Sequence, residues 1–193
     1  WQDIDLKKQR LTVRRSIRYN SVRHRTEIGT TKRKKIRSVD FCNTLAEILK
    51  EAKKTQMLDR LACGPLYSQN YYLSIEEKNR TYYEVYSLPV SEHPPEGYQA
   101  ISLVCVRQDG RYESPATVSN VCRAAKKRVD GMESFHFHQL RHTFTSNLLS
   151  YGAAPKDVQE LLGHSDVTTT MNIYAHASKE AKRDAAKLLD KVQ

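Results

Sequence analysis

Four side chains near the C-terminus, His138, Arg141, His164 and Tyr174, follow one another in an order suited to chemistry on a phosphate ester. Arg141 stands three positions after His138, so at the start of a helix both side chains project from one face and can hold one phosphate. A phosphate undergoing displacement spreads negative charge over its non-bridging oxygens, which an arginine fork flanked by imidazole donors can match. Tyr174 lies ten residues beyond His164, and this position makes it the candidate nucleophile.

Each of these signals is weak when it is taken alone. The pattern His-x-x-Arg is common, a histidine after a helix end is usually a surface residue, and most of the eleven tyrosines are expected to pack or stack. Tyr174 must also lose its proton to attack, which requires a positively charged pocket rich in hydrogen-bond donors. Arg141 and the histidines would supply that pocket, so the conjunction favours a catalytic function.

The order of the boxes, residues 138–142, then 161–164, then Tyr174, resembles the C-terminal boxes of the tyrosine recombinase (phage-type integrase) family. The resemblance implies site-specific DNA recombination, the integration or excision of a mobile element, through a 3′-phosphotyrosyl intermediate. It implies Tyr174 as nucleophile, with Arg141, His138 and His164 on the scissile phosphate. It also implies double-stranded DNA attachment sites as partners, a homo-tetramer of the full-length protein on DNA, and no cofactor.

In this family a lysine from a β-hairpin ahead of the boxes protonates the leaving 5′ oxygen. The strand at residues 39–41 matches the strand that follows the hairpin, and counting back from it gives Lys32 as the general acid. Lys34 and Lys35 remain rivals if the turn is one residue longer. On either reading we expect Arg33, Lys34 and Lys35 to bind DNA phosphates.

The resemblance also indicates what precedes such a region in the family. We expect residues 1–193 to form the C-terminal catalytic domain without its first helices and without the N-terminal core-binding domain. The family's first catalytic arginine has no counterpart here, since the chain starts at the strand that follows that arginine. Loss of one charge-assisted contact to a developing oxyanion costs about 3–4 kcal/mol, so we expect this chain alone to be nearly inactive.

The charge of the chain independently favours a polyanionic partner. Lys and Arg number 32 against 22 Asp and Glu, which gives a net charge of +10 at neutral pH. Residues 1–40 hold thirteen of these cations against four carboxylates. Nucleic acid is therefore the expected partner.

The remaining composition argues against metal, disulfide and membrane classes. The cysteines are widely separated, without a Cys-x-x-Cys pair: Cys42, Cys63, Cys105 and Cys122. His136 and His142 lie close to His138, but three histidines so close on a helix rarely converge, and no carboxylate or cysteine cluster joins them. We therefore expect no metal, no membrane span, and a cytoplasmic, nucleoid-associated protein.

Local patterns predict an α+β fold, mainly helical, with a small basic antiparallel β-sheet in one domain. Residues 10–39 are rich in β-branched and basic residues and predict that sheet, while 64–113 are rich in tyrosine and predict strands and loops. Helical spacing of apolar residues predicts helices over 43–52, 115–129, 139–151, 155–162 and 178–192. Asn43 or Thr44 is the expected N-cap of the first helix, and Gly163 is expected to end the helix at 155–162. A further short helix is expected to carry Tyr174.

Two alternative functions use the same residues. Residues 156–162, Gly163 and 166–174 also scan as a helix-turn-helix, which predicts a DNA-binding module without enzymatic activity. That interpretation leaves the His-x-x-Arg pattern and the basic hairpin unexplained. A type IB-like topoisomerase would use the same catalytic residues to relax DNA without exchanging partner strands.

Overall fold

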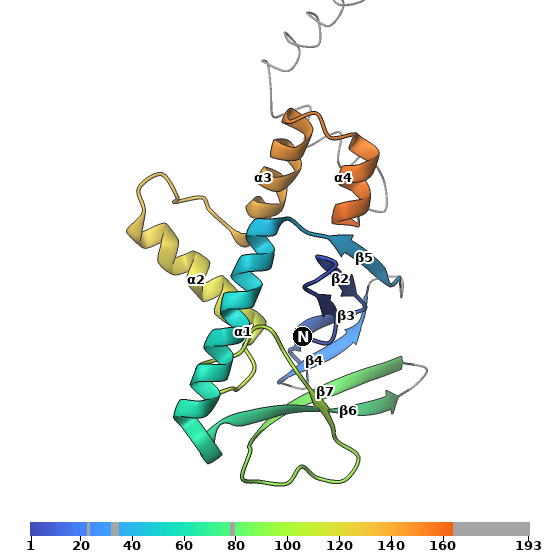
Figure 1. Ribbon diagram of the computed structural model, residues 1–193, viewed down its shortest axis with the longest axis vertical. Coiled ribbons are helices and arrows are strands. Elements are labelled where there is room, and N and C mark those ends of the chain that lie inside the picture. Colours follow the sequence, from blue (N-terminus) through green and yellow to red (C-terminus); the bar gives the residue numbers. More distant parts are fainter. Residues whose placement is uncertain (23, 32–34, 78–79, 164–193) are drawn as a thin grey trace, which may run out of the picture. The chain divides into compact units, whose positions relative to one another are not determined.

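The computed structural model describes residues 1–22, 24–31, 35–77 and 80–163. The chain divides into two compact units, Trp1–Thr117 and Val118–Gln193. The first unit holds all the described strands and the helix α1. The described part of the second holds most of α2 and the helices α3 and α4 (Figure 1). Within the described residues, none of the helices is long and apolar enough to cross a membrane.

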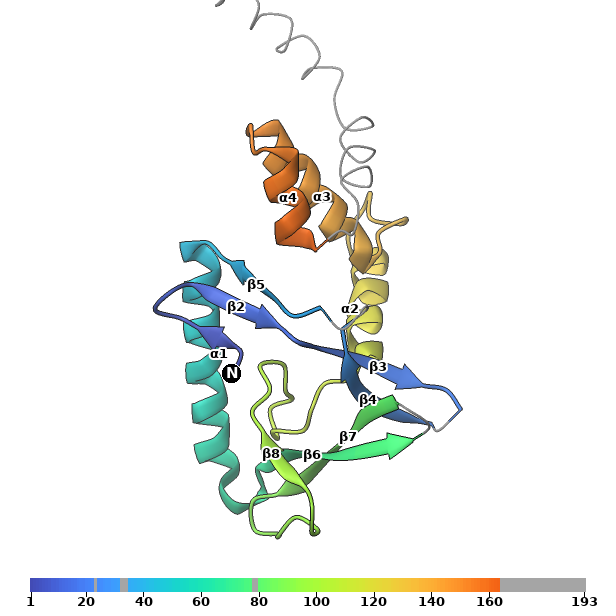
Figure 2. The ribbon, with the colours of Figure 1, turned by 90° about the vertical axis from the view of Figure 1, so that its right-hand side faces the viewer.

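The basic N-terminal strands contribute to two sheets. β1 (Ile4–Asp5), β2 (Arg10–Val13) and β5 (Arg37–Asp40) form a three-stranded antiparallel sheet in the order β1-β2-β5. β3 (Arg15–Asn20) follows β2 after one residue, yet it pairs in a different sheet. The single basic sheet that the sequence predicts is therefore wrong in its pairing, although its residues are strands (Figure 2).

The second sheet joins these strands to the tyrosine-rich segment. Its order is β3-β4-β7-β6-β8, all antiparallel, with the bounds β4 Arg25–Thr30, β6 Ser68–Glu77, β7 Arg80–Pro89 and β8 Gln99–Ile101. Ile28, Val85 and Ile101 form its buried cluster. Tyr72 and Tyr83 pack against this cluster and contact each other edge to face. The tyrosines of the middle segment thus serve partly as core residues, as the sequence argument expects for most of them.

Helix α1 (Asn43–Cys63) follows β5 and is twice as long as predicted. Cys42 occupies the N-cap position, so the prediction of Asn43 or Thr44 there is wrong. Ala46 and Leu49 are the buried residues on its inner face. The helix ends at Cys63 with Gly64 as its C-cap, and a short 3-10 helix, η2 (Gly64–Leu66), leads into β6.

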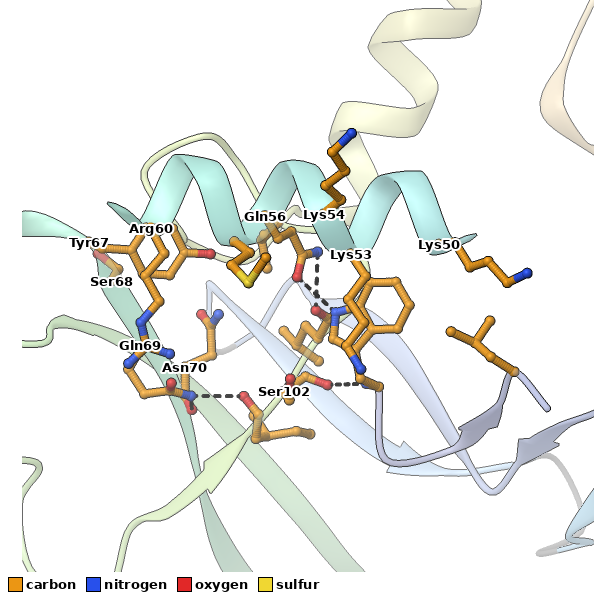
Figure 3. Close-up of a pocket in the computed structure, with 16 residues that line it drawn as sticks. Lys50, Lys53, Lys54, Gln56, Arg60, Tyr67, Ser68, Gln69, Asn70 and Ser102 are labelled. Atoms are coloured by element: carbon orange, nitrogen blue, oxygen red, sulfur yellow. Dashed lines mark hydrogen bonds between the residues drawn. The ribbon is translucent and has the colours of Figure 1, made fainter. Parts of the chain in front are cut away.

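A cavity of about 470 Å³ lies between α1 and the strands β6 and β8 (Figure 3). Gln56 of α1 joins two other segments beside the cavity. Its Oε1 accepts a hydrogen bond from Trp1 Nε1 at 2.8 Å, and its Nε2 donates to the Val104 carbonyl. Lys53 Nζ lies 5.8 Å from the centroid of the Trp1 ring. This polar bridge ties the helix to the segment after β8.

The loop before α2 is anchored on β6 by its backbone. The Ser68 N–H donates to Asp109 O at 2.8 Å, and the buried Asn70 amide donates to Gly110 O at 2.9 Å. Gly110 has φ +84°, and a Cβ there would lie 2.4 Å from the Ser68 carbonyl oxygen. Only glycine fits this approach of two backbones.

The helices of the second unit follow the predicted spacing closely. α2 (Pro115–Arg128), α3 (Phe137–Ser150) and α4 (Pro155–Leu162) correspond to the predicted helices at 115–129, 139–151 and 155–162. Proline opens α4 at its first turn and Gly163 ends it at φ +66°, as predicted. The predicted helix at 178–192 and the one carrying Tyr174 lie outside the described residues.

α3 and α4 pack against each other through a small apolar cluster. Leu149 contributes from α3, while Val158 and Leu162 contribute from α4, and Val158 is fully buried. Thr145 of α3 is also fully buried. Both ribbon views show the two helices side by side (Figures 1 and 2).

Candidate active site

The start of α3 is fixed by its first turn. His136 occupies the N-cap position in an extended conformation, and its backbone N–H donates to Gln139 Oε1 at 2.8 Å. The His136 side chain in turn accepts from the Gln139 backbone, and the two bonds together form a capping box. The sequence predicts the helix start at 139, since a histidine is not a usual N-cap residue. The cap adds two residues to the helix, so His138 and Arg141 both lie on its first two turns.

Arg141 is held by the end of the neighbouring helix. Its Nη2 donates to the Leu162 carbonyl oxygen at 2.7 Å. Leu162 is the last residue of α4, whose final carbonyls have no partner within the helix and carry the negative end of its dipole. The backbone carbonyl of Arg141 also accepts a hydrogen bond from the buried Thr145 Oγ1 at 2.8 Å. Arg141 is partly buried and is positioned from two sides.

His138 and His142 form a pair on the exposed part of α3. Their ring centroids lie 5.1 Å apart with an interplanar angle of 83°. His142 is exposed, and its ring contacts that of His138. The Arg141 side chain bonds the Leu162 carbonyl, and the Thr145 hydroxyl bonds the Arg141 backbone carbonyl within α3.

The structure places His138 and Arg141 on one helix, as predicted. Lys32, Arg33, Lys34, His164 and Tyr174 lie outside the described residues. The roles of all these residues stay predictions.

Lys35 is the one residue of the predicted basic hairpin cluster that lies within the described ranges. Its side chain is exposed, and its backbone carbonyl accepts a hydrogen bond from the buried Thr31 Oγ1 at 2.5 Å. That bond joins the two sides of the segment between β4 and β5. An exposed ammonium at this position suits a phosphate contact.

Several arginines of the basic N-terminal strands are engaged in ion pairs. Arg10 makes a two-point contact with Asp40, through Nε at 2.6 Å and Nη2 at 3.1 Å, and Asp40 lies directly opposite it on β5. The hydrogen bond from Arg10 lowers the pKa of Asp40 below its ordinary value. Asp3 accepts contacts from both Arg14 and Arg15. Part of the positive charge in residues 1–40 therefore stabilises the sheets.

Comparison with known proteins places the chain in a family. The model of the Phage integrase family matches residues 1–181. The chain belongs to the phage integrase family. Among curated members, the "Tyrosine recombinase XerC-like" protein of Caldanaerobacter subterraneus subsp. tengcongensis is 29% identical over 98% of this chain and 43% of its own length.

Two solved structures carry the same fold. The Tn1549 transposon integrase in complex with a circular intermediate DNA matches with a TM-score of 0.62 and 18% identity, over 96% of this chain and 50% of that one. The XerA recombinase matches with a TM-score of 0.55 and 18% identity, over 97% of this chain and 48% of that one. The α+β recombinase fold predicted for this phage integrase family member is confirmed. The chain spans about half the length of these proteins or less.

Proposed function

We propose that the chain is the catalytic portion of a site-specific DNA recombinase that integrates or excises a mobile element. The support lies in the order of His138, Arg141, His164 and Tyr174 within a chain that the family model matches over residues 1–181. The attachment of Arg141 to the end of α4 adds to this support, since a guanidinium held in one orientation can meet a phosphate without reorganisation.

The proposed reaction has two steps, cleavage and rejoining. The Tyr174 phenolate attacks the scissile phosphorus, the bond from phosphorus to the 5′ oxygen breaks, and Lys32 gives its proton to that oxygen. Arg141, His138 and His164 stabilise the charge on the non-bridging oxygens. The 5′ hydroxyl of a partner strand then attacks the phosphotyrosine and gives its proton back to the neutral Lys32, and Tyr174 leaves as the phenolate. The covalent intermediate conserves the phosphodiester bond energy, so rejoining requires no nucleotide.

The proposed partners are double-stranded attachment sites, bound by a homo-tetramer of the full-length protein. Arg33, Lys34 and Lys35 contact phosphates near the cleaved bond in this proposal. The Tn1549 transposon integrase, which has this fold, is described in complex with a circular intermediate DNA, and that supports a mobile element as the setting.

The decisive experiment compares the full-length protein with its Tyr174→Phe variant on a duplex whose nick traps the intermediate. We expect a slow-migrating protein–DNA band on a denaturing gel for the wild type only, with DNA binding equal in both. No adduct from the wild type, together with weaker binding by Tyr174→Phe, would support the helix-turn-helix module instead.

A second substrate separates recombination from topoisomerase activity. Two attachment-site duplexes of different lengths should yield products of recombinant length. Relaxation of supercoiled plasmid without such products would identify a topoisomerase. The Tyr174→Phe variant serves as the control in both assays, because it removes the nucleophile and keeps the ring.

A further inference from the structure

His138 and His142 lie one helical turn apart on the same exposed side of α3. Residues four apart on a helix are neighbours, and here the rings touch edge to face with centroids 5.1 Å apart. The helix beneath them is fixed by the capping box at its start and by Leu149, which packs on α4. Two imidazoles are thus presented to solvent from a rigid backbone.

This spacing is the one that zinc-binding helices use, with two histidines at positions i and i+4 on one face. Imidazole nitrogen is a preferred ligand of Zn²⁺, Ni²⁺ and Cu²⁺. We propose that His138 and His142 together bind a divalent transition-metal ion of this class. His136 has a different role, because it is the N-cap residue of α3.

The site would be open and reversible rather than that of a resident cofactor. Within residues 1–163, apart from the undescribed gaps, no three His, Cys, Asp or Glu side chains are grouped for a metal. Two protein ligands leave the remaining coordination positions to water. The three histidines do not form one ligand set, because His138 and His142 pair with each other and His136 is the N-cap of α3.

Metal binding at this pair has a consequence for catalysis, which rests on the proposed function. A ring nitrogen of His138 that coordinates a metal ion cannot donate a hydrogen bond to a phosphate oxygen. In this proposal the ion and the scissile phosphate use the same ring nitrogen of His138 and therefore compete for it. Transition-metal ions should inhibit DNA cleavage, and a chelator should restore it.

The binding test titrates ZnCl₂ and, separately, NiCl₂ into the 193-residue chain by isothermal calorimetry. We expect His142→Ala and His138→Ala each to weaken binding by about tenfold or more, since one ligand of two is lost. The exposed His93, in the other compact unit, supplies the control His93→Ala, which should bind as the wild type does. His142→Gln is the second variant, in case the alanine variants fold poorly. Wild-type binding that is absent, or unchanged in the His142 variants, would overturn the proposal.

The inhibition test uses the full-length protein and the nicked duplex, with each variant's rate normalised to its own metal-free rate. We expect Zn²⁺ to inhibit the wild type, EDTA to reverse the inhibition, and His142→Gln to resist it. Equal inhibition of wild type and His142→Gln would overturn the competition. Failure of the proposed function would give a different result, namely no adduct in metal-free buffer, and would leave the calorimetric result intact.

Discussion

Arg141 illustrates how a single residue can be prepared for phosphate chemistry by its neighbours. Its side chain donates to the last carbonyl of α4 and its own carbonyl accepts from Thr145, so both ends of the residue are constrained. A guanidinium fixed in this way loses little conformational entropy when it binds a phosphate. The sequence contains the arginine but gives no sign that its side chain donates to the last carbonyl of a neighbouring helix.

Replacement of Arg141 by lysine should separate positive charge from fork geometry. We expect Arg141→Lys in the full-length protein to slow adduct formation by about a hundred- to a thousandfold, because the ammonium cannot contact two phosphate oxygens in a fixed plane. DNA affinity should change little, since the charge is kept. Single-turnover cleavage of the nicked duplex and a binding titration measure the two quantities. A rate within a few-fold of the wild type would contradict this role for Arg141.

The boundaries of helices show which features of an element are local. The predicted helix at 155–162 coincides with α4, because proline and glycine mark its ends within a few residues. The start of α3 was missed, since a histidine at the N-cap is not a usual signal. α1 extends to Cys63, far beyond the predicted residue 52. Intrinsic patterns therefore locate helices better than they delimit them.

Local sequence patterns do not determine which strands pair in the two sheets. β2 and β3 are separated by a single residue, Arg14, and both contain arginine and β-branched residues, yet they belong to different sheets. Their separation depends on β7, which pairs with β4 from more than fifty residues away. Strand pairing between distant segments is decided by packing over the whole unit, so the single basic sheet was a reasonable but wrong prediction.

Gly163 provides a test of how the end of α4 is built. Its φ of +66° is unfavourable for β-branched residues, so we expect Gly163→Val to lower the free energy of unfolding by about 1–2 kcal/mol. Asparagine tolerates this conformation, so Gly163→Asn is the matched control and should lose less. Denaturant unfolding, followed by circular dichroism, measures both. Equal loss in the two variants would show that backbone conformation at 163 is not the cause.

The ion pair between Arg10 and Asp40 predicts a pH effect on the β2–β5 pairing. Because Arg10 lowers the pKa of Asp40, the stabilisation is present above the ordinary aspartate pKa and is lost as pH falls through the lowered value. Arg10→Gln should raise the pKa of Asp40 toward its ordinary value. A carboxyl carbon NMR titration measures this, and Arg14→Gln, which affects Asp3, is the control. An Asp40 pKa unchanged in Arg10→Gln would remove Arg10 as the cause.

For the molecule as a whole, the net charge of +10 predicts DNA binding that weakens steeply with salt. If six to ten phosphates are contacted, affinity should fall by roughly a thousandfold or more between about 50 and 200 mM salt. Lys35→Gln should reduce the slope of log affinity against log salt by about one. The control is Lys50→Gln, because the Lys50 ammonium already pairs with Glu47 at 2.7 Å. A slope that is unchanged in Lys35→Gln would exclude Lys35 from the contacts.

The six residues from 31 to 36 join the last residue of β4, in one sheet, to the first residue of β5, in the other. Neither strand can slip by one position to absorb an extra residue, because such a slip turns every side chain of the strand to the opposite face. Surface connections usually tolerate insertions and deletions in evolution. This one should not: across related proteins its length should vary less than its amino-acid sequence.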